Sequence, residues 1–192
     1  MMTKTLDRLP ALGKDETRPL LPLITKLALL LVVVAASTLM IGTQSAQAAP
    51  SSYTYYQVIA RHSDKCLDVA FALTGDGTDV IQGSCWGGTN QQWYLRPTGN
   101  EGYYQMIARH SQKCLDVEHD SRSHGANVIQ WTCHGGWNQQ WYLRPVGVDG
   151  YYEVVGRNSG ICLDVENMSQ DHMANVIQGT CWGGPNQQWR FA

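Results

Sequence analysis

The 192-residue sequence lacks the short motifs that mark most enzymes. It contains no Gly-x-Ser-x-Gly, no His-Glu-x-x-His and no glycine-rich phosphate loop. The sequence also lacks Cys-x-x-Cys and His-x-x-x-His, so we expect no metal site and no cofactor. Nor does the sequence present the two flanking carboxylates that a glycosidase needs. It therefore predicts a protein without catalytic activity.

The sequence also has little positive charge and no helical periodicity, which excludes some classes of partner and of fold. Residues 49–192 carry 9 Lys and Arg against 13 Asp and Glu, a net charge of −4 with neutral histidines. Phosphate binding needs a basic patch, so nucleic acid is not expected as a partner. No charge run or basic amphipathic segment suggests attachment to anionic membranes. No window shows a sustained 3.6-residue apolar period, which predicts little helix.

What the sequence does contain is one unit written three times. Cys-Leu-Asp-Val begins at Cys66, Cys114 and Cys162, and Val-Ile-Gln and Asn-Gln-Gln-Trp follow in each copy at a constant offset of 48 residues. A fixed period of this size indicates a copied supersecondary unit with a shared core. Three copies favour closure around a threefold axis over an open solenoid, which needs capping repeats.

Each unit has four short segments of strand character. In the first unit these are the run after Tyr55-Tyr56, residues 66–69, residues 80–82 and residues 92–95. A loop rich in Gly, Asp, Asn and Ser separates the second and third segments. Pro97 and Pro145 mark the joins between units. The pattern predicts an all-β barrel or capped barrel, anchored by one tryptophan per repeat: Trp93, Trp141 and Trp189.

The first 48 residues have the composition of a secretory signal peptide. A basic leader precedes 16 uncharged residues from Leu27 to Gly42, and Ala46-Gln47-Ala48 supplies the small residues of a cleavage site. We expect cleavage after Ala48, because a membrane-spanning helix needs roughly 20 residues. An uncleaved anchor is the alternative. Cleavage leaves one domain, residues 49–192, with repeats at about 49–96, 97–144 and 145–192 and no membrane attachment.

All six cysteines fall within the repeats, two in each and 19 residues apart. Six cysteines allow many pairings, but identical units should close identical loops. We therefore expect three disulfides, and such bonds suit a secreted, extracellular protein. The expected pairs are Cys66–Cys85, Cys114–Cys133 and Cys162–Cys181.

The combination of Cys-Leu-Asp-Val with Gln-x-Trp at Gln91, Gln139 and Gln187 resembles the ricin B-type lectin family. That family includes carbohydrate-binding modules attached to bacterial polysaccharide hydrolases. The resemblance covers residues 52–192. It implies a β-trefoil, a six-stranded barrel capped by three hairpins, with one disulfide and one sugar pocket per repeat.

The resemblance also assigns roles to residues. In such lectins the Asp of Cys-x-Asp accepts hydrogen bonds from two sugar hydroxyls, and the Asn before Gln-x-Trp adds another contact. A carboxylate and an amide suit this task, because the first accepts and the second both donates and accepts. For the aspartates a turn-forming role is the alternative, and for the glutamines a role in orienting the aspartate is favoured. The candidates are Asp68, Asn90 and Gln91, then Asp116, Asn138 and Gln139, then Asp164, Asn186 and Gln187.

The units differ where the family places an aromatic ring that stacks on the sugar. Two residues before the second cysteine, the second unit has Trp131, whereas the others have Gly83 and Gly179. The first and third units instead carry Trp86 and Trp182 directly after that cysteine. Aromatic faces give a large apolar contact with sugar C–H groups. All three tryptophans are therefore candidate platforms, and the second pocket matches the family best.

Two sets of polar residues remain without a sugar-binding role. Family members often have Gln four residues before the second cysteine. Here the glutamine lies one residue later, at Gln82, Gln130 and Gln178, which turns it to the opposite strand face. The histidines at equivalent repeat positions are interpreted as surface or turn residues rather than metal ligands: His62, His110, His124 and His172.

These observations predict a secreted, non-catalytic lectin with up to three pockets for galactose- or xylan-type glycans. Single sites of this kind bind on the order of millimolar, and three pockets on one rigid body compensate through avidity. Two alternatives stay open. One is a protein-binding β-trefoil such as a protease inhibitor, and the other is an accessory subunit of a polysaccharide hydrolase.

Overall fold

The computed structural model describes residues 50, 51, 53–100 and 102–192. The expected signal peptide lies outside these residues. In the described part no helix is long and apolar enough to cross a membrane.

Each repeat contributes four strands and two three-residue 3₁₀ helices. The first repeat contains β1 (Tyr55–Ala60), β2 (Cys66–Val69), η1 (Ala70–Ala72), β3 (Thr78–Gly83), η2 (Thr89–Gln91) and β4 (Gln92–Pro97). The second contains β5 (Tyr103–Ala108), β6 (Cys114–Val117), η3 (Glu118–Asp120), β7 (Ala126–Trp131), η4 (Trp137–Gln139) and β8 (Trp141–Val146). The third contains β9 (Tyr151–Gly156), β10 (Cys162–Val165), η5 (Glu166–Met168), β11 (Val176–Gly179), η6 (Pro185–Gln187) and β12 (Gln188–Phe191).

Six strands, two from each repeat, close into an antiparallel barrel. β1 pairs with β4 and β12, β5 pairs with β4 and β8, and β9 pairs with β8 and β12. Every one of these strands therefore has a neighbour on both sides, so the barrel presents no open edge for pairing with another chain.

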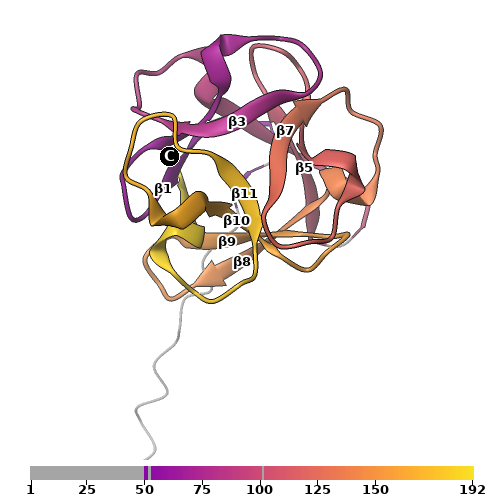
Figure 1. The fold of residues 1–192 in the computed structure, drawn as a ribbon. Coiled ribbons are helices and arrows are strands. Elements are labelled where there is room, and N and C mark those ends of the chain that lie inside the picture. The colour runs from indigo at the N-terminus through magenta and orange to yellow at the C-terminus, as the bar shows by residue number, and fades with distance from the viewer. Residues whose placement is uncertain (1–49, 52, 101) are drawn as a thin grey trace, which may run out of the picture. The chain divides into compact units, whose positions relative to one another are not determined.

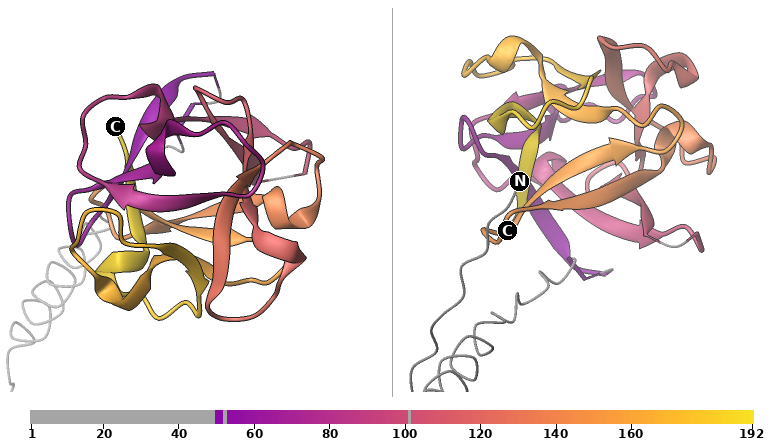
Figure 2. Two further views of the ribbon diagram at one scale, coloured as in Figure 1. Left: turned by 45° about the horizontal axis from the view of Figure 1, so that its top comes forward. Right: turned by 90° about the horizontal axis from the view of Figure 1, so that it is seen from below.

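The other six strands form three hairpins, β2–β3, β6–β7 and β10–β11. Figure 1 looks onto these hairpins, and Figure 2 shows them from the side at one end of the barrel. They pair with one another through β3–β7 and β7–β11, and a bridge between Ile81 and Asn175 joins the third side. A barrel capped by three hairpins around a threefold axis is a β-trefoil, the fold that the family resemblance implies.

One tryptophan per repeat anchors the core where barrel and hairpins meet. Trp93, Trp141 and Trp189 are fully buried in the apolar cluster. Each indole N–H donates to the backbone carbonyl of the leucine in Cys-Leu-Asp-Val, at 3.0–3.1 Å. A buried N–H without an acceptor costs about 1–3 kcal/mol, so this bond fixes the ring against the hairpin. The predicted role of these tryptophans is confirmed.

The three expected disulfides are all present, with Cα atoms 5.1–5.2 Å apart. In the first repeat the bond joins Cys66, at the start of β2, to Cys85 in the loop after β3. That loop carries Trp86 and leads into η2. The disulfide therefore holds the loop beside the strand that carries Asp68.

The two prolines lie at the ends of strands, next to the turns that join one repeat to the next. Pro97 is the last residue of β4 and pairs with Tyr104, and Pro145 lies inside β8 opposite Tyr152. Proline has no N–H to donate, so it is tolerated near strand ends where the ladder does not need that donor. The turns that join the repeats follow directly, between β4 and β5 and between β8 and β9.

The glutamine of Val-Ile-Gln ties each repeat to a neighbouring one. Gln130 is fully buried; its Nε2 donates to the carbonyls of Leu73 and Gly75, and its Oε1 accepts from Ser111. Gln82 and Gln178 make the equivalent contacts. These side chains hold the loop of the neighbouring repeat in place.

Candidate functional site

Each hairpin holds its aspartate in a clamp of two amides. In the second repeat Asp116 lies on β6, while Asn138 and Gln139 lie on η4. Asn138 Nδ2 donates to Asp116 Oδ1 at 2.8 Å, and Gln139 Nε2 donates to Asp116 Oδ2 at 2.7 Å. Both donors are side chains, so the aspartate does not serve as a backbone turn former. The same clamp recurs around Asp68 and Asp164.

The clamped carboxylates are largely withdrawn from water, with 3–6% of each residue exposed. Burial raises the pKa of Asp116 above its ordinary value, and the hydrogen bond from Gln139 and the charge of nearby His134 partly oppose this shift. Burial likewise raises the pKa of Asp68 and of Asp164. A buried carboxylate with free lone pairs is a strong acceptor for hydroxyl groups that reach it.

The glutamine of the clamp is a support rather than a surface contact. Gln139 is fully buried, and its Nε2 donates to Thr132 as well as to Asp116. Its Oε1 accepts from the backbone N–H of His134. Gln91 and Gln187 are bonded in the same way, and none of the three glutamines lines the hollows described below. This geometry corresponds to the favoured role of these glutamines, which is to orient the aspartate.

In the third repeat the clamp leaves one buried acceptor without a partner among the described residues. Asn186 Nδ2 donates to Asp164 and to the carbonyl of Val165, which uses both of its hydrogens. Its Oδ1 is buried and has no hydrogen-bond partner among the described residues. Asn186 lines a hollow beside Asp164.

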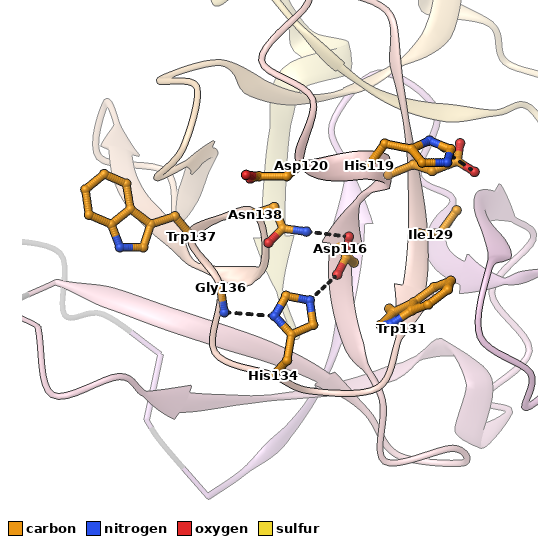
Figure 3. A pocket seen from close by; sticks show the side chains of 10 residues that line it. Asp116, His119, Asp120, Ile129, Trp131, His134, Gly136, Trp137 and Asn138 are labelled. Atoms are coloured by element: carbon orange, nitrogen blue, oxygen red, sulfur yellow. Dashed lines mark hydrogen bonds and ion pairs between the residues drawn. The ribbon is translucent and has the colours of Figure 1, made fainter.

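Among the hollows beside the three aspartates, that of Asp116 is the largest, with a volume of about 410 Å³. Figure 3 shows Trp131 and Trp137 on opposite sides of Asp116, with His134 and Asn138 next to the carboxylate. His134 Nδ1 accepts from the N–H of Gly136, so in the neutral ring the hydrogen is on Nε2, 3.5 Å from Asp116 Oδ2. Acceptor, donor and aromatic surface thus converge on one space.

Both indole rings of this hollow are held in place. Trp131 ends β7, and its ring lies against the turn of the first repeat at Gly77. Trp137 begins η4, and the guanidinium of Arg157 lies 4.7 Å from its ring centroid. Trp131 is 42% exposed, which leaves surface for stacking. Trp137 is absent from the sequence-predicted candidates, although its place beside Asn138 was a usable signal.

The hollows of the first and third repeats are smaller, about 270 Å³ and 250 Å³, and built differently. The side chain of Asp68 packs against Gly83, and a Cβ on this glycine would collide with the carboxylate. Asp164 packs against Gly179 in the same way. A side chain at these positions would therefore require the aspartate to shift. Trp86 instead lies over Gly88 and borders the first hollow.

The third hollow follows the same plan as the first. The ring of Trp182 lies over Gly184, and a Cβ on that glycine would collide with it. Trp182 borders the hollow together with Asp164. The sequence-predicted residues thus meet in three groups. These are Asp68, Trp86 and Asn90; Asp116, Trp131 and Asn138; and Asp164, Trp182 and Asn186.

A histidine from the neighbouring repeat completes the two smaller hollows. His172 borders the hollow of Asp68, and its Nδ1 accepts from the N–H of Ser84 at 3.1 Å. His124 borders the hollow of Asp164 and accepts from Thr180 in the same way. In the neutral rings Nε2 therefore carries the hydrogen and remains a donor. These histidines lie in turns, as predicted, but sequence reasoning missed their place in the site.

The described residues contain no cluster of three or more His, Cys, Asp or Glu side chains that could hold a metal ion. The chemistry available in the three hollows is hydrogen bonding by carboxylate, amide and imidazole groups beside exposed indole rings. That combination suits a neutral, polyhydroxylated ligand with apolar C–H faces.

The family of ricin-type β-trefoil lectin domains matches residues 54–189. Among solved structures, the designed threefold-symmetric protein ThreeFoil is 57% identical, with a TM-score of 0.70 over 72% of this chain and 97% of its own. An exo-β-1,3-galactanase from Clostridium thermocellum is 33% identical, with a TM-score of 0.71 over 75% of this chain and 31% of its own.

The ricin B-like lectin of Macrolepiota procera, solved with lactose, shares the fold. It is 17% identical, with a TM-score of 0.65 over 75% of this chain and 98% of its own.

Proposed function

Because this chain belongs to the family of ricin-type β-trefoil lectin domains, we propose that it is a non-catalytic lectin with one sugar pocket in each repeat. Domains of this family generally bind sugars rather than transform them. The proposal rests chiefly on the hollow of the second repeat, where Asp116, Asn138 and His134 face a space between two indole rings.

The polar groups of this hollow complement a sugar. The carboxylate of Asp116 accepts from two vicinal hydroxyls, and hydrogen bonds to a charged group contribute roughly 1.5–3 kcal/mol each. His134 Nε2 donates to a sugar oxygen, and the face of Trp131 packs against sugar C–H groups. Gln139 touches no ligand but keeps the carboxylate in position.

The first and third hollows act as weaker pockets of altered geometry. Trp86 and Trp182 take the place of the missing ring, and His172 and His124 supply the donor. Their smaller volumes leave room for a single sugar unit.

Galactose-type glycans are the proposed ligands, and their binding outside the cell is the proposed activity. The 33% identity to part of a galactanase supports the sugar class. The three disulfides support an oxidising compartment. A signal peptide cleaved after Ala48 completes this proposal.

Glycan-array binding of the wild type and of Trp131→Ala and Trp86→Ala tests it. We expect Trp131→Ala to lose about tenfold in affinity for galactose-type glycans, because about 1.4 kcal/mol of stacking disappears. Trp86→Ala, a change of equal size at another exposed ring, should lose less. Equal binding by Trp131→Ala and wild type would refute the assignment of the main pocket.

A matrix experiment separates the lectin from a protease inhibitor. Retention on a galactose- or xylan-type matrix with elution by free sugar supports the lectin. Inhibition of proteases without any retention contradicts it.

A further inference from the structure

A fourth hollow lies on the side of the barrel, where the first repeat meets the second. Its volume is about 380 Å³, and none of the candidate sugar-binding residues borders it. Its polar and aromatic walls come from β1, β4 and the turns beside them. They are Tyr53, Tyr55, Tyr94, Arg96 and Gln112.

Tyrosine rings form much of this hollow. The rings of Tyr55 and Tyr94 meet edge to face, with centroids 5.5 Å apart and planes at 80°. The guanidinium of Arg109 lies 4.8 Å from the centroid of the Tyr55 ring. The hollow therefore offers aromatic surface with a cation close by.

The two arginines here have neutral partners. Arg96 donates from Nε and Nη2 to Gln105 Oε1, at 3.1 Å and 2.6 Å. Arg109 donates to the side-chain oxygen of Gln92. No carboxylate among the described residues forms an ion pair with either guanidinium. Two positive charges at one junction thus lack an acidic partner in the part of the chain that the structure describes.

The other two junctions provide an internal comparison, because the repeats align at 48 residues. Arg144, the equivalent of Arg96, pairs with Glu153 at 2.7 Å. Arg61, the equivalent of Arg109, lies 3.7 Å from Asp149, and Asp149 occupies the repeat position of Tyr53. The first junction has exchanged both acids for neutral groups: Gln105 stands where the second has Glu153, and Tyr53 where the third has Asp149.

We propose that this hollow is a binding site for an acidic sugar, a saccharide unit that carries a carboxylate. The carboxylate pairs with the guanidinium of Arg96, whose planar donors match it, and the sugar ring packs on Tyr94. The three aspartate pockets disfavour the same ligand, since each already presents a buried carboxylate. Neutral sugars therefore bind at the aspartate hollows, and acidic sugars bind at the hollow beside Arg96.

Galacturonic acid and galactose form the matched pair for the test, because they differ only in a carboxylate against a hydroxymethyl group. Titration of each into the isotope-labelled protein, followed by heteronuclear NMR, locates the binding. We expect galacturonate to shift the signals of Tyr94 and Arg96, with an affinity that falls as salt is raised. Galactose should leave these signals in place.

Two substitutions with matched controls make the test specific. Arg96→Gln should weaken galacturonate binding at least fivefold, while Arg122→Gln, an equal charge change at an exposed arginine, should not. Tyr94→Ala should weaken it likewise, and Tyr142→Ala at the equivalent repeat position should not. The indole signals of the buried tryptophans report whether each variant is folded. Unchanged galacturonate binding by Arg96→Gln overturns the proposal, and so do shifts that galactose reproduces.

Since this site shares no residue with the aspartate pockets, its failure leaves the lectin proposal untouched. Conversely, loss of neutral-sugar binding at Asp116 would not affect galacturonate shifts at Tyr94.

Discussion

At the scale of single residues, the site depends on how a carboxylate is kept ionised in a nearly buried position. Asp116 receives one amide donor on each oxygen, from Asn138 and Gln139. Each donor is itself fixed by a second acceptor, the carbonyl of Val117 or of Thr132. The side chain is thus oriented before any ligand arrives, and little further entropy is lost on binding.

Asp116→Asn tests this arrangement with the smallest change of shape. The new amide places a hydrogen-bond donor against the amide donors of the clamp, so we expect unfolding free energy to fall by about 1–2 kcal/mol. Affinity for galactose-type sugar at this pocket should fall at least tenfold, measured by calorimetry. Asp68→Asn serves as the matched control, because it disturbs an equal clamp but leaves the main pocket intact.

The raised aspartate pKa values give sugar binding a defined pH dependence. Burial raises the pKa of Asp116, Asp68 and Asp164 above 3.8. A protonated carboxyl accepts fewer hydroxyl donors, so affinity should fall on acidification with a midpoint above pH 3.8. Calorimetric titrations at stepwise pH values check this, and a midpoint below pH 3.8 would contradict it.

The free energy of unfolding should change in the opposite direction to the sugar affinity over the same pH range. The folded chain holds these three protons more tightly than the unfolded chain, so their protonation adds stability as pH falls through the raised pKa. Asp76 behaves oppositely, because the hydrogen bond from Lys113 lowers its pKa, and its contribution is lost only below pH 3.8. Urea unfolding of wild type and Asp116→Asn across this range separates the two effects.

At the scale of structural elements, the functional unit is a hairpin, its 3₁₀ turn and the loop that the disulfide fastens. Residues that are identical in all repeats build this unit. Residues that differ, such as Trp131 against Gly83, lie on the rim and shape the hollow. This division explains how one fold presents three unlike pockets.

The hairpins also depend on one another, because Gln130 bonds two carbonyls of the preceding repeat. Gln130→Met keeps the volume but leaves those carbonyls and Ser111 without this partner. We expect a loss of about 3 kcal/mol in unfolding free energy, measured with urea. Ser111→Ala removes a single bond and should cost about 1 kcal/mol; an equal cost for both variants would contradict this role.

A residue of one repeat should affect the pocket of another. His172 belongs to the third repeat, but it borders the hollow of Asp68 in the first. His172→Ala should therefore weaken sugar binding at Asp68 about fivefold, because a hydrogen-bond donor is lost. NMR shifts of Ser84 and Trp86 on galactose addition report this pocket. Unaltered titration of those signals would show that the imidazole does not touch the ligand.

At the scale of the whole molecule, the threefold arrangement places the three proposed sugar pockets on one rigid body. A linked set of sites gains apparent affinity by factors of roughly 10² or more when the ligand is multivalent. A single sugar gains nothing from this arrangement, since it occupies one pocket at a time.

Avidity predicts a sharp contrast between soluble and immobilised ligand. Asp116→Asn removes one pocket of three. It should lower binding to a galactan-coated surface far more than it lowers the total binding of free galactose to the separate pockets. The triple variant with Asp68→Asn and Asp164→Asn should abolish retention. Surface plasmon resonance with free galactose as competitor measures both. Equal retention by the single variant and the wild type would exclude cooperation of the pockets.

The repeat made much of the fold predictable from sequence. A constant offset of 48 residues implies identical units, and identical units imply the disulfide pairs, the tryptophan anchors and threefold closure. The aspartates and asparagines of the hollows follow from the same motif, because each must occupy the same place in its hairpin.

The tertiary structure alone decided what the repeats do to one another. His172 reaches the pocket of Asp68, Gln130 bonds the loop of the first repeat, and Gln139 lies behind its aspartate. Tyr53, Arg96 and Gln112 gather at one junction although up to 59 residues separate them. Sequence periodicity describes neighbours within a strand or turn, whereas these contacts arise only when barrel closure sets distant segments side by side.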